Sequence, residues 1–346
     1  MLFVSHNASR SGAPLLLLEF ERWLVANTAA QVSTALLDGG PLAGRFGEVG
    51  PVLGPDDLAT AEADLVYLNT VGSAAALHRL APGPRVVCHV HELDYALAHW
   101  ITEGDREALR RRVDRFVVVS DLVRDALVRG VGVDPARIVR HYGFIDVPAV
   151  RAAAGDHHDR HHDHAAPLVG TSGTTEWRKA PDLFVALAGT VRRARPDATF
   201  CWVGGSATGP EIDQVLADRA RAGLDEAVVF VGEQPDAVRW FAGYDVFALL
   251  SRDDPFPLTC LECAALEVPV VAFDSTGARE FLADGCGVVV PYPDVEAMAG
   301  AVVDLLGDPE RRAALVERAA RRVEAEHDLA VAAPRLFAEL QSVLAA

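Results

Sequence analysis

The chain of 346 residues is poor in lysine, in regularly spaced cysteine and in long apolar runs. Of its 32 basic side chains, only Lys179 is a lysine. Because arginine serves here wherever a generic positive charge is needed, a single lysine indicates a position that requires a compact ammonium group on a flexible stem. Phosphate-binding sites are one such position. Chance retention of one codon is the other interpretation.

Positive charge as a whole is also scarce. The formal net charge is −17, which excludes general nucleic-acid binding because that function needs a basic surface. Residues 1–150 are nearly neutral, with 14 basic and 18 acidic side chains. They include Arg110, Arg111, Arg112 and Arg115, which either belong to a solvated helix face or contact an acidic acceptor or a membrane surface. We expect membrane contact to be peripheral at most.

The sequence predicts neither a membrane span nor a disulfide framework. No apolar run reaches the roughly 18 residues that cross a bilayer, and residues 1–6 are typical of a strand rather than a signal peptide, so we expect a cytoplasmic protein. The five cysteines are odd in number, and Cys260 and Cys263 have no second pair to complete a zinc site. We expect reduced, buried thiols and no bound metal.

Length and patterning indicate two domains. A chain of 346 residues exceeds one ordinary core. Short apolar runs alternate with amphipathic stretches in both halves, which predicts an α/β fold with a parallel sheet covered on both faces in each half. The predicted divisions are an N-terminal domain over 1–148, a linker over 149–166, a second domain over 167–325, and a C-terminal helix over 326–346 that packs back on the N-terminal domain.

The expected strands define the two sheets. In the first half they cover 1–7, 32–37, 65–68, 86–90, 115–119 and 138–143. In the second half they cover 168–173, 199–204, 228–232, 246–250, 268–273 and 288–291. Expected helices include 15–26, which Ser11 caps, 181–194, 261–266 and 334–344. Two such domains place their ligand crevice between the carboxyl ends of facing strands.

The predicted linker has an unusual composition. Residues 149–166 contain five of the chain's 12 histidines. A mobile polar linker explains this composition, and a metal-binding tract is the alternative.

Three strand-to-helix loops combine small residues with charge. Residues 7–13 let backbone amides approach an anion at a helix start. Arg178 and Lys179 follow a strand and a glycine-containing loop, which suits a diphosphate but lacks the spacing of a P-loop. Asp254 and Glu262 flank a loop whose amides can donate to phosphate, while the carboxylates can accept from sugar hydroxyls. The three loops favour a ligand that carries both phosphate and sugar.

The sequence from Ser251 to Glu262, Ser-Arg-Asp-Asp-Pro-Phe-Pro-Leu-Thr-Cys-Leu-Glu, with Val-Pro-Val-Val-Ala at 268–272, resembles the E-x7-E signature of retaining glycosyltransferases of family 4. Residues 173–180, Gly-Thr-Thr-Glu-Trp-Arg-Lys-Ala, resemble the family's G-R-L-x-x-x-K-G segment. Further matching segments are 118–120, 142–143, 277–281 and 287–291. Because these segments occur in the family's order and spacing, the resemblance extends over most of the chain.

This resemblance implies the GT-B architecture, in which two Rossmann-like domains face each other across a cleft. Residues 1–148 would then bind the acceptor, and residues 167–325 would bind the nucleotide-sugar donor. It implies transfer of a sugar from a nucleotide diphosphate sugar, UDP rather than GDP, with retention at the anomeric carbon. The acceptor would be a hydroxyl of a glycan, a lipid-linked or a small-molecule substrate. Neither a metal nor another cofactor would be required.

The resemblance also implies roles for individual residues. Lys179 would hold the diphosphate, Asp254 would contact hydroxyls of the donor sugar, and Glu262 would contact the ribose. His91 would line the sugar and acceptor side. The remaining donor-binding positions, among which Glu233 and Gln234 lie near the nucleobase, would be Gly12, Ala13, Gly173, Thr174, Arg178, Glu233, Gln234, Pro257, Leu258 and Thr259.

Three positions depart from the family pattern. Asp254 replaces its first glutamate and is one methylene shorter, Thr174 stands at its arginine position, and Ala180 replaces a glycine. Arg178 could supply the missing charge, although neighbouring residues at a helix start do not face the same way as Lys179.

Several site residues also have simpler interpretations. His89 faces the same side of a strand as His91, so either could be the site residue, and both could be structural. Glu92 either orients the histidine or is solvated. Trp177 and Trp240 are expected to be packing anchors.

Two other functions compete with glycosyl transfer. Another GT-B enzyme, such as a nucleotide-sugar epimerase or a phosphorylase, is the first, and a phosphorylase would use its lysine for pyridoxal phosphate. The short chain and the D-x7-E segment argue against it. The second is a catalytically degenerate family member that acts as a binding subunit, which Thr174 and Asp254 favour.

Overall fold

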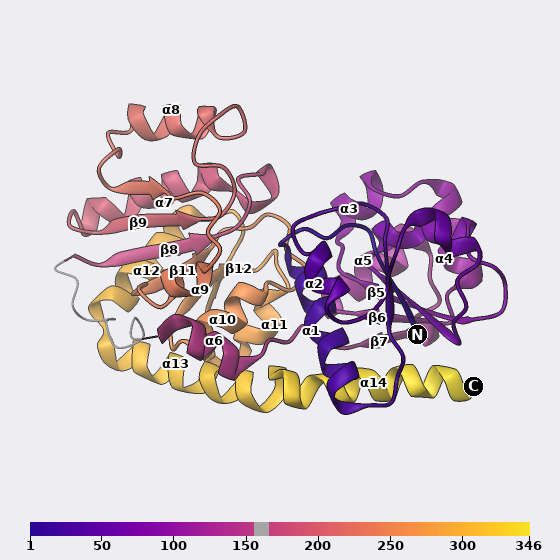
Figure 1. Ribbon diagram of the computed structural model, residues 1–346. Coiled ribbons are helices and arrows are strands. Elements are labelled where there is room, and N and C mark those ends of the chain that lie inside the picture. The colour runs from indigo at the N-terminus through magenta and orange to yellow at the C-terminus, as the bar shows by residue number, and fades with distance from the viewer. Residues whose placement is uncertain (156–165) are drawn as a thin grey trace. The chain divides into compact units, whose positions relative to one another are not determined.

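The computed structural model describes residues 1–155 and 166–346. They divide into two compact units, which are described separately below. Unit 1 comprises Met1–Ile145 and His327–Ala346, and unit 2 comprises Asp146–Glu326. Each unit is built on one parallel sheet with helices around it (Figure 1). The predicted α/β class with two parallel sheets is therefore confirmed.

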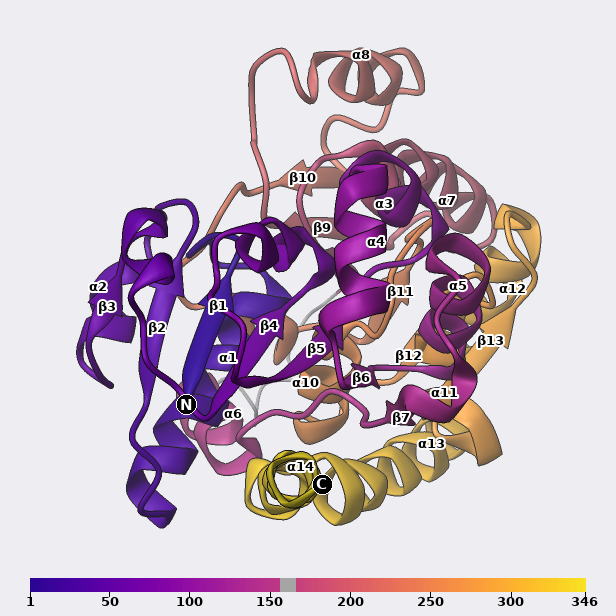
Figure 2. The same ribbon diagram turned by 90° about the vertical axis from the view of Figure 1, so that its right-hand side faces the viewer.

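The sheet of unit 1 has the strand order β3-β2-β1-β4-β5-β6-β7 (Figure 2). Its strands are β1 (Leu2–Ser5), β2 (Ser33–Leu36), β3 (Val52–Leu53), β4 (Leu65–Asn69), β5 (Arg85–Val90), β6 (Arg115–Val118) and β7 (Ile138–Arg140). Every residue of β1 and β4 is buried, as expected for parallel strands covered on both faces. The chain order reverses between the paired strands β1 and β4, which makes this pair the topological switch point of the sheet.

Helices cover both faces of this sheet. They are α1 (Gly12–Asn27), α2 (Ala43–Gly47), α3 (Asp94–His99), α4 (Glu103–Arg112), α5 (Asp121–Val131), α14 (Leu329–Ala345) and the 3₁₀ segments η1 (Pro55–Ala59), η2 (Val71–His78) and η3 (Pro135–Arg137). Phe3 of β1 packs against Phe20 of α1, with ring centroids 6.2 Å apart. Trp23 of α1 contacts Phe337 of α14, so the C-terminal helix belongs to the core of unit 1.

The sheet of unit 2 has the order β10-β9-β8-β11-β12-β13. Its strands are β8 (Leu168–Ser172), β9 (Thr199–Val203), β10 (Val228–Phe230), β11 (Val246–Leu249), β12 (Val270–Phe273) and β13 (Val288–Val290). Here the order reverses between β8 and β11, which are paired in parallel. Unit 2 thus has a switch point of the same kind as unit 1.

Two helical layers enclose the sheet of unit 2 (Figure 1). The helices are α6 (Val147–Ala154), α7 (Pro181–Ala194), α8 (Asp213–Arg221), α9 (Ala237–Phe241), α10 (Leu258–Ala265), α11 (Ala278–Leu282), α12 (Val295–Gly307), α13 (Pro309–Arg322) and the 3₁₀ turns η5 (Trp177–Lys179) and η6 (Ala283–Gly285). Residues of α7 and α12 share one core cluster with β8 and β9, and α6, α9 and α10 contact one another. A π-helical turn, η7 (Val323–His327), joins α13 to α14.

The predicted linker over 149–166 begins inside a helix. Asp146 caps α6 by accepting from the backbone amide of Ala149, so residues up to Ala154 are helical rather than irregular. The histidine-rich remainder of the linker, and with it the metal-binding alternative, lies outside the described residues. The C-terminal helix begins at Leu329, three residues after the start of the predicted segment 326–346 and five residues before the expected helix 334–344. Asp328 caps it by accepting from Ala330, and Pro334 is accommodated within it.

Two arginines of the neutral half have structural partners. Arg112 donates to the carbonyl oxygens of Leu77 and Leu80 at 2.5 and 2.9 Å, and Arg110 donates to Val131 at 2.9 Å. Cationic side chains at these positions satisfy carbonyl groups at the ends of helical segments. The interpretation of these arginines as a solvated helix face is therefore incomplete, because Arg110 and Arg112 also bind backbone carbonyl groups.

Cysteines, metal ligands and membrane spans were all considered from composition. All five cysteines are free and buried, as predicted. Within residues 1–155 and 166–346, no three or more His, Cys, Asp or Glu side chains are grouped so that they could hold a metal ion. No helix in the described part of the chain is both long and apolar enough to cross a membrane.

Candidate functional site

In unit 2, Lys179 and Asp254 meet at the switch point. Lys179 ends the turn η5 after β8, and Asp254 follows β11. The Lys179 Nζ donates to Asp254 Oδ2 at 2.5 Å, and the two side chains are 18% and 7% exposed. Ser251 Oγ also donates to this carboxylate at 3.4 Å. The two charged residues predicted from separate segments thus form one ion pair.

Glycine allows the loops around this pair to approach one another closely. A Cβ atom on Gly173 would lie 3.0 Å from Cγ of Lys179, so the lysine stem passes directly over this residue. A Cβ atom on Gly204, after β9, would lie 2.7 Å from the Gly173 carbonyl oxygen. Gly204 also donates to the Gly232 carbonyl, after β10, at 2.8 Å. Side chains at these positions would push apart the strand ends that carry Lys179.

Arg178 is directed at the main chain. Its Nη1 donates to the carbonyl oxygen of Asp253 at 3.0 Å, and its own carbonyl accepts from the amide of Arg252 at 2.8 Å. Arg178 thereby joins the loop after β8 to the loop after β11. Thr174, at the family's arginine position, is exposed.

Arg252 strengthens the same connection. Its guanidinium donates to both carboxylate oxygens of Asp182 at 2.9 and 2.6 Å and to the Trp177 carbonyl at 2.8 Å. Its carbon lies 5.3 Å from the centroid of the Trp177 ring. The prediction that Trp177 and Trp240 are packing anchors was wrong, because they are 60% and 39% exposed.

Ala180 occupies an unusual backbone conformation. It follows Lys179 with φ +61° and ψ +52°, in the left-handed region, and its side chain is fully buried. α7 begins at the next residue, Pro181. The family's glycine at this position would adopt the same conformation without a Cβ penalty.

Glu262 and the predicted phosphate-contacting amides lie on α10. Leu258 and Thr259 form its first turn, where backbone amides have no intrahelical acceptor. Pro257 stands at the N-cap position and provides no side-chain cap. Burial raises the pKa of Glu262 to about 7. A carboxyl group with this pKa can either accept or donate a hydrogen bond near neutral pH.

The predicted nucleobase contacts follow β10. Gln234 donates through Nε2 to the Val231 carbonyl at 3.0 Å, and Glu233 is exposed. Since parallel strands end at the same edge of their sheet, these residues share the carboxyl edge of unit 2 with Lys179 and Asp254.

In unit 1, the two candidate histidines differ in environment. His89 lies within β5, is fully buried, and its Nδ1 lies 2.5 Å from the Tyr67 hydroxyl. His91 follows the strand and is partly exposed, and its ring centroid is 4.2 Å from that of His89. Burial lowers the pKa of His91 to about 3, so its imidazole is neutral. Of the two residues, only His91 could meet a ligand.

Glu92 is not solvated. It is 3% exposed, and its Oε2 accepts from the backbone amides of His91 at 2.8 Å and Val71 at 3.2 Å. Burial raises its pKa to about 7, although these hydrogen bonds lower it. Glu92 therefore fixes the chain direction at the ends of both β4 and β5.

Two residues at the unit 1 switch point were not predicted from the sequence. His6 follows β1 and Thr70 follows β4, and their Nδ1 and Oγ1 atoms are 3.0 Å apart. Thr70 has φ +79°, a conformation that is unusual for a β-branched residue. The signal in the sequence was weak, because neither residue belongs to a motif and their proximity depends on the strand order.

The loop before α1 is closed by its own side chains. The Asn7 Oδ1 accepts from the amide and the hydroxyl of Ser9 at 3.1 and 2.9 Å. Ser11 stands at the N-cap position, but its hydroxyl contacts Ser9 Oγ at 2.9 Å and caps no amide. The predicted capping interaction was therefore wrong. Gly12 and Ala13 form the first turn of α1, as an anion site would require.

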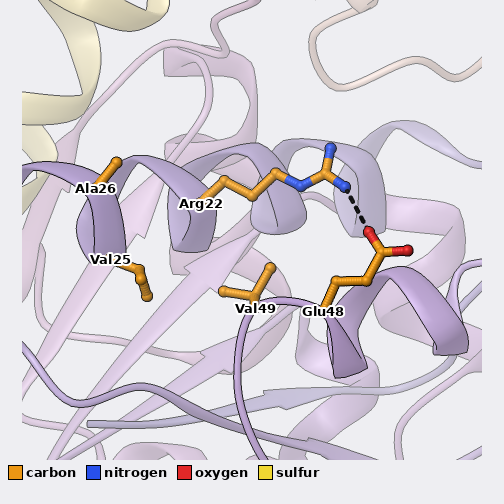
Figure 3. A pocket seen from close by; sticks show the side chains of 5 residues that line it. All are labelled: Arg22, Val25, Ala26, Glu48 and Val49. Carbon is orange, nitrogen blue, oxygen red and sulfur yellow. Dashed lines mark hydrogen bonds and ion pairs between the residues drawn. The ribbon is translucent and has the colours of Figure 1, made fainter.

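A surface hollow lies elsewhere on unit 1 (Figure 3). Its lining residues are Arg22, Val25, Ala26, Glu48 and Val49. Arg22 and Glu48 form an ion pair of 3.3 Å across it. None of the predicted site residues lines this hollow.

Comparison with known proteins links these features to one family. Residues 166–308 match the family model described as glycosyl transferases group 1, and residues 55–148 match glycosyltransferase family 4. The crystal structure of Anabaena HepE in complex with UDP and glucose superposes with a TM-score of 0.85 at 17% identity, and covers 99% of both chains. This likeness gives unit 1 and unit 2 the GT-B fold that the sequence predicted.

Curated relatives are glycosyltransferases by name. The chain is 30% identical over 291 residues to the GDP-mannose-dependent alpha-(1-6)-phosphatidylinositol monomannoside mannosyltransferase of Mycolicibacterium smegmatis, which covers 76% of this chain and 71% of the relative. It is 35% identical over 161 residues to the lipopolysaccharide core biosynthesis mannosyltransferase LpsB of Rhizobium meliloti, over 44% of this chain and 45% of that protein. For three such relatives the chain spans only about half of their length. The motifs, the fold and the first of these alignments together place the chain in glycosyltransferase family 4.

Proposed function

We propose that the chain transfers a sugar from a nucleoside diphosphate sugar to a hydroxyl group of an acceptor. The observation that carries this proposal is the Lys179–Asp254 ion pair at the switch point of unit 2, in a chain of a glycosyltransferase family. An ammonium group suits the diphosphate, and a carboxylate suits the hydroxyls of a sugar.

Departure of the nucleoside diphosphate places negative charge on the leaving phosphate. In the proposed mechanism, Lys179 and the first-turn amides of α10 stabilise that charge. The ammonium group has three donors, so Lys179 can keep its hydrogen bond to Asp254 while it donates to phosphate. The second oxygen of Asp254 then accepts from a sugar hydroxyl.

We propose retention of configuration without a metal ion. In a front-face reaction the leaving phosphate oxygen takes the proton of the acceptor hydroxyl, so no side chain has to act as the base. Lys179 supplies a positive charge that a metal ion would otherwise supply to the diphosphate.

The nucleobase of the donor sugar nucleotide is the first feature to be tested. We propose a UDP-sugar as the donor, which the HepE complex with UDP and glucose supports by analogy. GDP-mannose is the second candidate, because the Mycolicibacterium smegmatis relative is named as GDP-mannose-dependent. For the acceptor we propose a glycan or a lipid-linked sugar, the classes named in these relatives.

Calorimetric titration with UDP, GDP and ADP tests the proposal directly. Binding of UDP or GDP, together with slow hydrolysis of the corresponding sugar nucleotide, is expected of a transferase that lacks its acceptor. Binding without any hydrolysis or transfer would instead indicate a degenerate binding subunit. If none of the three nucleotides binds, the proposal is wrong.

A further inference from the structure

We propose that Trp202 is a positioning residue for Lys179. The indole N–H of Trp202 binds the main-chain carbonyl of Gly173, and the side chain of Lys179 lies on Gly173. The inference rests on the proposed function for the part that Lys179 plays in transfer, whereas the placement of its side chain can be tested without any nucleotide. Trp202 belongs to none of the segments that resemble the family.

Trp202 extends one polar atom from the core of unit 2 to the edge of the sheet. It lies in β9 and is fully buried, and its ring centroids are 5.5 Å from that of Phe184 and 5.7 Å from that of Phe230. A buried indole N–H needs an acceptor. Here the acceptor is the carbonyl oxygen of Gly173, 2.9 Å away in the loop after β8. Trp202 thus connects the apolar core with the loop that leads to Lys179.

Gly173 has no side chain that could fix its main chain, so its conformation depends on its neighbours. Its amide donates to the Val203 carbonyl oxygen at 2.9 Å, and its carbonyl accepts from Trp202. A Cβ atom on Gly204 would lie 2.7 Å from the same carbonyl oxygen, so glycine at that position leaves room for it. The peptide groups on both sides of Gly173 are therefore tied to the end of β9.

The Lys179 side chain is supported along its length by Gly173. A Cβ atom built on Gly173 would lie 3.0 Å from Cγ, 3.1 Å from Cδ and 3.4 Å from Cβ of Lys179. The far end of the side chain is held by Asp254, whose Oδ2 is 2.5 Å from Nζ. Because a lysine side chain has many rotamers, a fixed support beneath three of its carbon atoms restricts where the ammonium group can lie.

The place of the ammonium group matters because charge stabilisation in a transition state needs donors that are oriented in advance. A misplacement of about 1 Å can cost about 10²-fold in rate, even when the altered residue is remote from the reacting atoms. The hydrogen bond from Trp202 to Gly173 therefore contributes to the transfer rate, although Trp202 itself contacts no substrate.

NMR of Lys179 tests the placement directly. Lys179 is the chain's only lysine, so labelling with ¹³C-lysine makes it the only labelled residue of the untagged protein. In a fixed side chain the two protons of each methylene group have different chemical shifts, whereas in a mobile side chain the two shifts become equal. We expect separate shifts at Cγ and Cδ in the ligand-free wild type. Equal shifts there would overturn the proposal.

A pair of variants separates the hydrogen bond from core packing. Trp202→Phe removes the N–H, and Phe230→Leu is the matched control because Phe230 packs against the same indole ring. We expect Trp202→Phe to make the two proton shifts equal at Cγ and Cδ of Lys179, while Phe230→Leu leaves them separate. The same spectrum for both variants would contradict a role for the N–H.

A tryptophan analogue decides the question if Trp202→Phe does not fold. Replacement of Trp202 by β-(3-benzothienyl)alanine keeps the shape of the ring and substitutes sulfur for the N–H group. We expect this replacement to reproduce the loss of separate shifts at Lys179. A spectrum like that of the wild type would refute the proposal, because the hydrogen bond would then have no effect on the lysine.

Kinetics connect the placement with transfer. We expect the benzothienylalanine protein to lose about tenfold in kcat at saturating donor, less than a full 1 Å misplacement costs. An unchanged kcat, despite altered Lys179 signals, would overturn the contribution of Trp202 to the rate. Titration of the labelled wild type with UDP and GDP tests the proposed function separately. If neither nucleotide moves the Lys179 signals, the proposed function is wrong, but the effect of Trp202 on the lysine still holds.

Discussion

The two units have the same topology at their switch points but different chemistry. In unit 2 the loops after β8 and β11 meet through the ion pair of Lys179 and Asp254. In unit 1 the loops after β1 and β4 meet through a neutral hydrogen bond between His6 and Thr70. Since the strand orders are equivalent, the loops alone decide which ligand each edge suits. Under the proposed function, the charged pair of unit 2 would suit a phosphorylated ligand, whereas the His6–Thr70 pair of unit 1 offers no ammonium group.

The largest effect is expected when the positive charge at the switch point of unit 2 is removed. We expect Lys179→Ala to lower kcat by about 10²–10³-fold, the range observed when one group that stabilises developing charge is removed. The measurement is transfer at saturating donor. Lys179→Arg is the control that keeps the charge but not the compact ammonium group. Activity of Lys179→Ala within a few-fold of wild type would remove Lys179 from the phosphate role.

A second effect concerns a buried carboxyl group in the interior of unit 1. Glu21 of α1 is buried, accepts from Thr34 at 2.8 Å, and burial raises its pKa to about 8. Its folded pKa lies above the unfolded value, so stability should fall as the pH rises from about 4.5 to 8. Glu21→Gln lacks this loss. At about 1.4 kcal/mol for each pKa unit, we expect it to gain a few kcal/mol over wild type at pH 8 and little at pH 4.5.

Urea unfolding at the two pH values measures this difference. Glu19→Gln is the control on the same helix, because Glu19 pairs with Arg22 and Arg45 at the surface. If the Glu21→Gln variant gains the same stability at both pH values, a titrating Glu21 is not the cause.

A third effect concerns the nucleotide affinity of unit 2 rather than stabilisation of charge on the leaving phosphate. We expect Glu262→Ala to raise the dissociation constant for UDP or GDP about tenfold, which corresponds to the loss of one hydrogen bond of about 1.4 kcal/mol. The exposed Glu267 provides the control Glu267→Ala. An unchanged constant in calorimetric titration of Glu262→Ala would exclude it from nucleotide binding.

The smallest effect is expected at Ala180. Glycine would relieve about 1 kcal/mol of left-handed strain but would remove a buried methyl group worth about 0.8 kcal/mol. Ala180→Gly should therefore leave the thermal stability nearly unchanged. A loss of several degrees in the melting temperature would show that the methyl group matters more than the backbone strain.

Much of the fold could be predicted because it follows from local pattern. The expected helix 181–194 coincides with α7, and apolar runs marked strands such as β4 and β11. The short β3 was missed because two residues provide too little pattern. The first turn of α14 was not predicted because proline is typical of a helix start, which placed the start at Pro334, whereas Asp328 caps the helix five residues earlier.

The site was predictable only where a motif carried it. Lys179 and Asp254 are 75 residues apart in the chain, and the motifs indicated each of them without indicating their direct contact. His6 and Thr70 belong to no motif, and only the strand order brings them together. The contact of Trp177 with Arg252 was not predicted because the two residues are far apart in the sequence.

The contacts of Arg252 with Asp182 and Trp177 determine whether the loops of unit 2 lose their conformational entropy on folding or on ligand binding. The loops after β8 and β11 are tied together by four hydrogen bonds from Arg178 and Arg252 side chains, three of them from Arg252. The entropy of fixing these loops is therefore lost on folding rather than on ligand binding. Under the proposed function, a donor that binds at Lys179 would meet loops that are already tied together, and more of the interaction free energy would remain available for affinity.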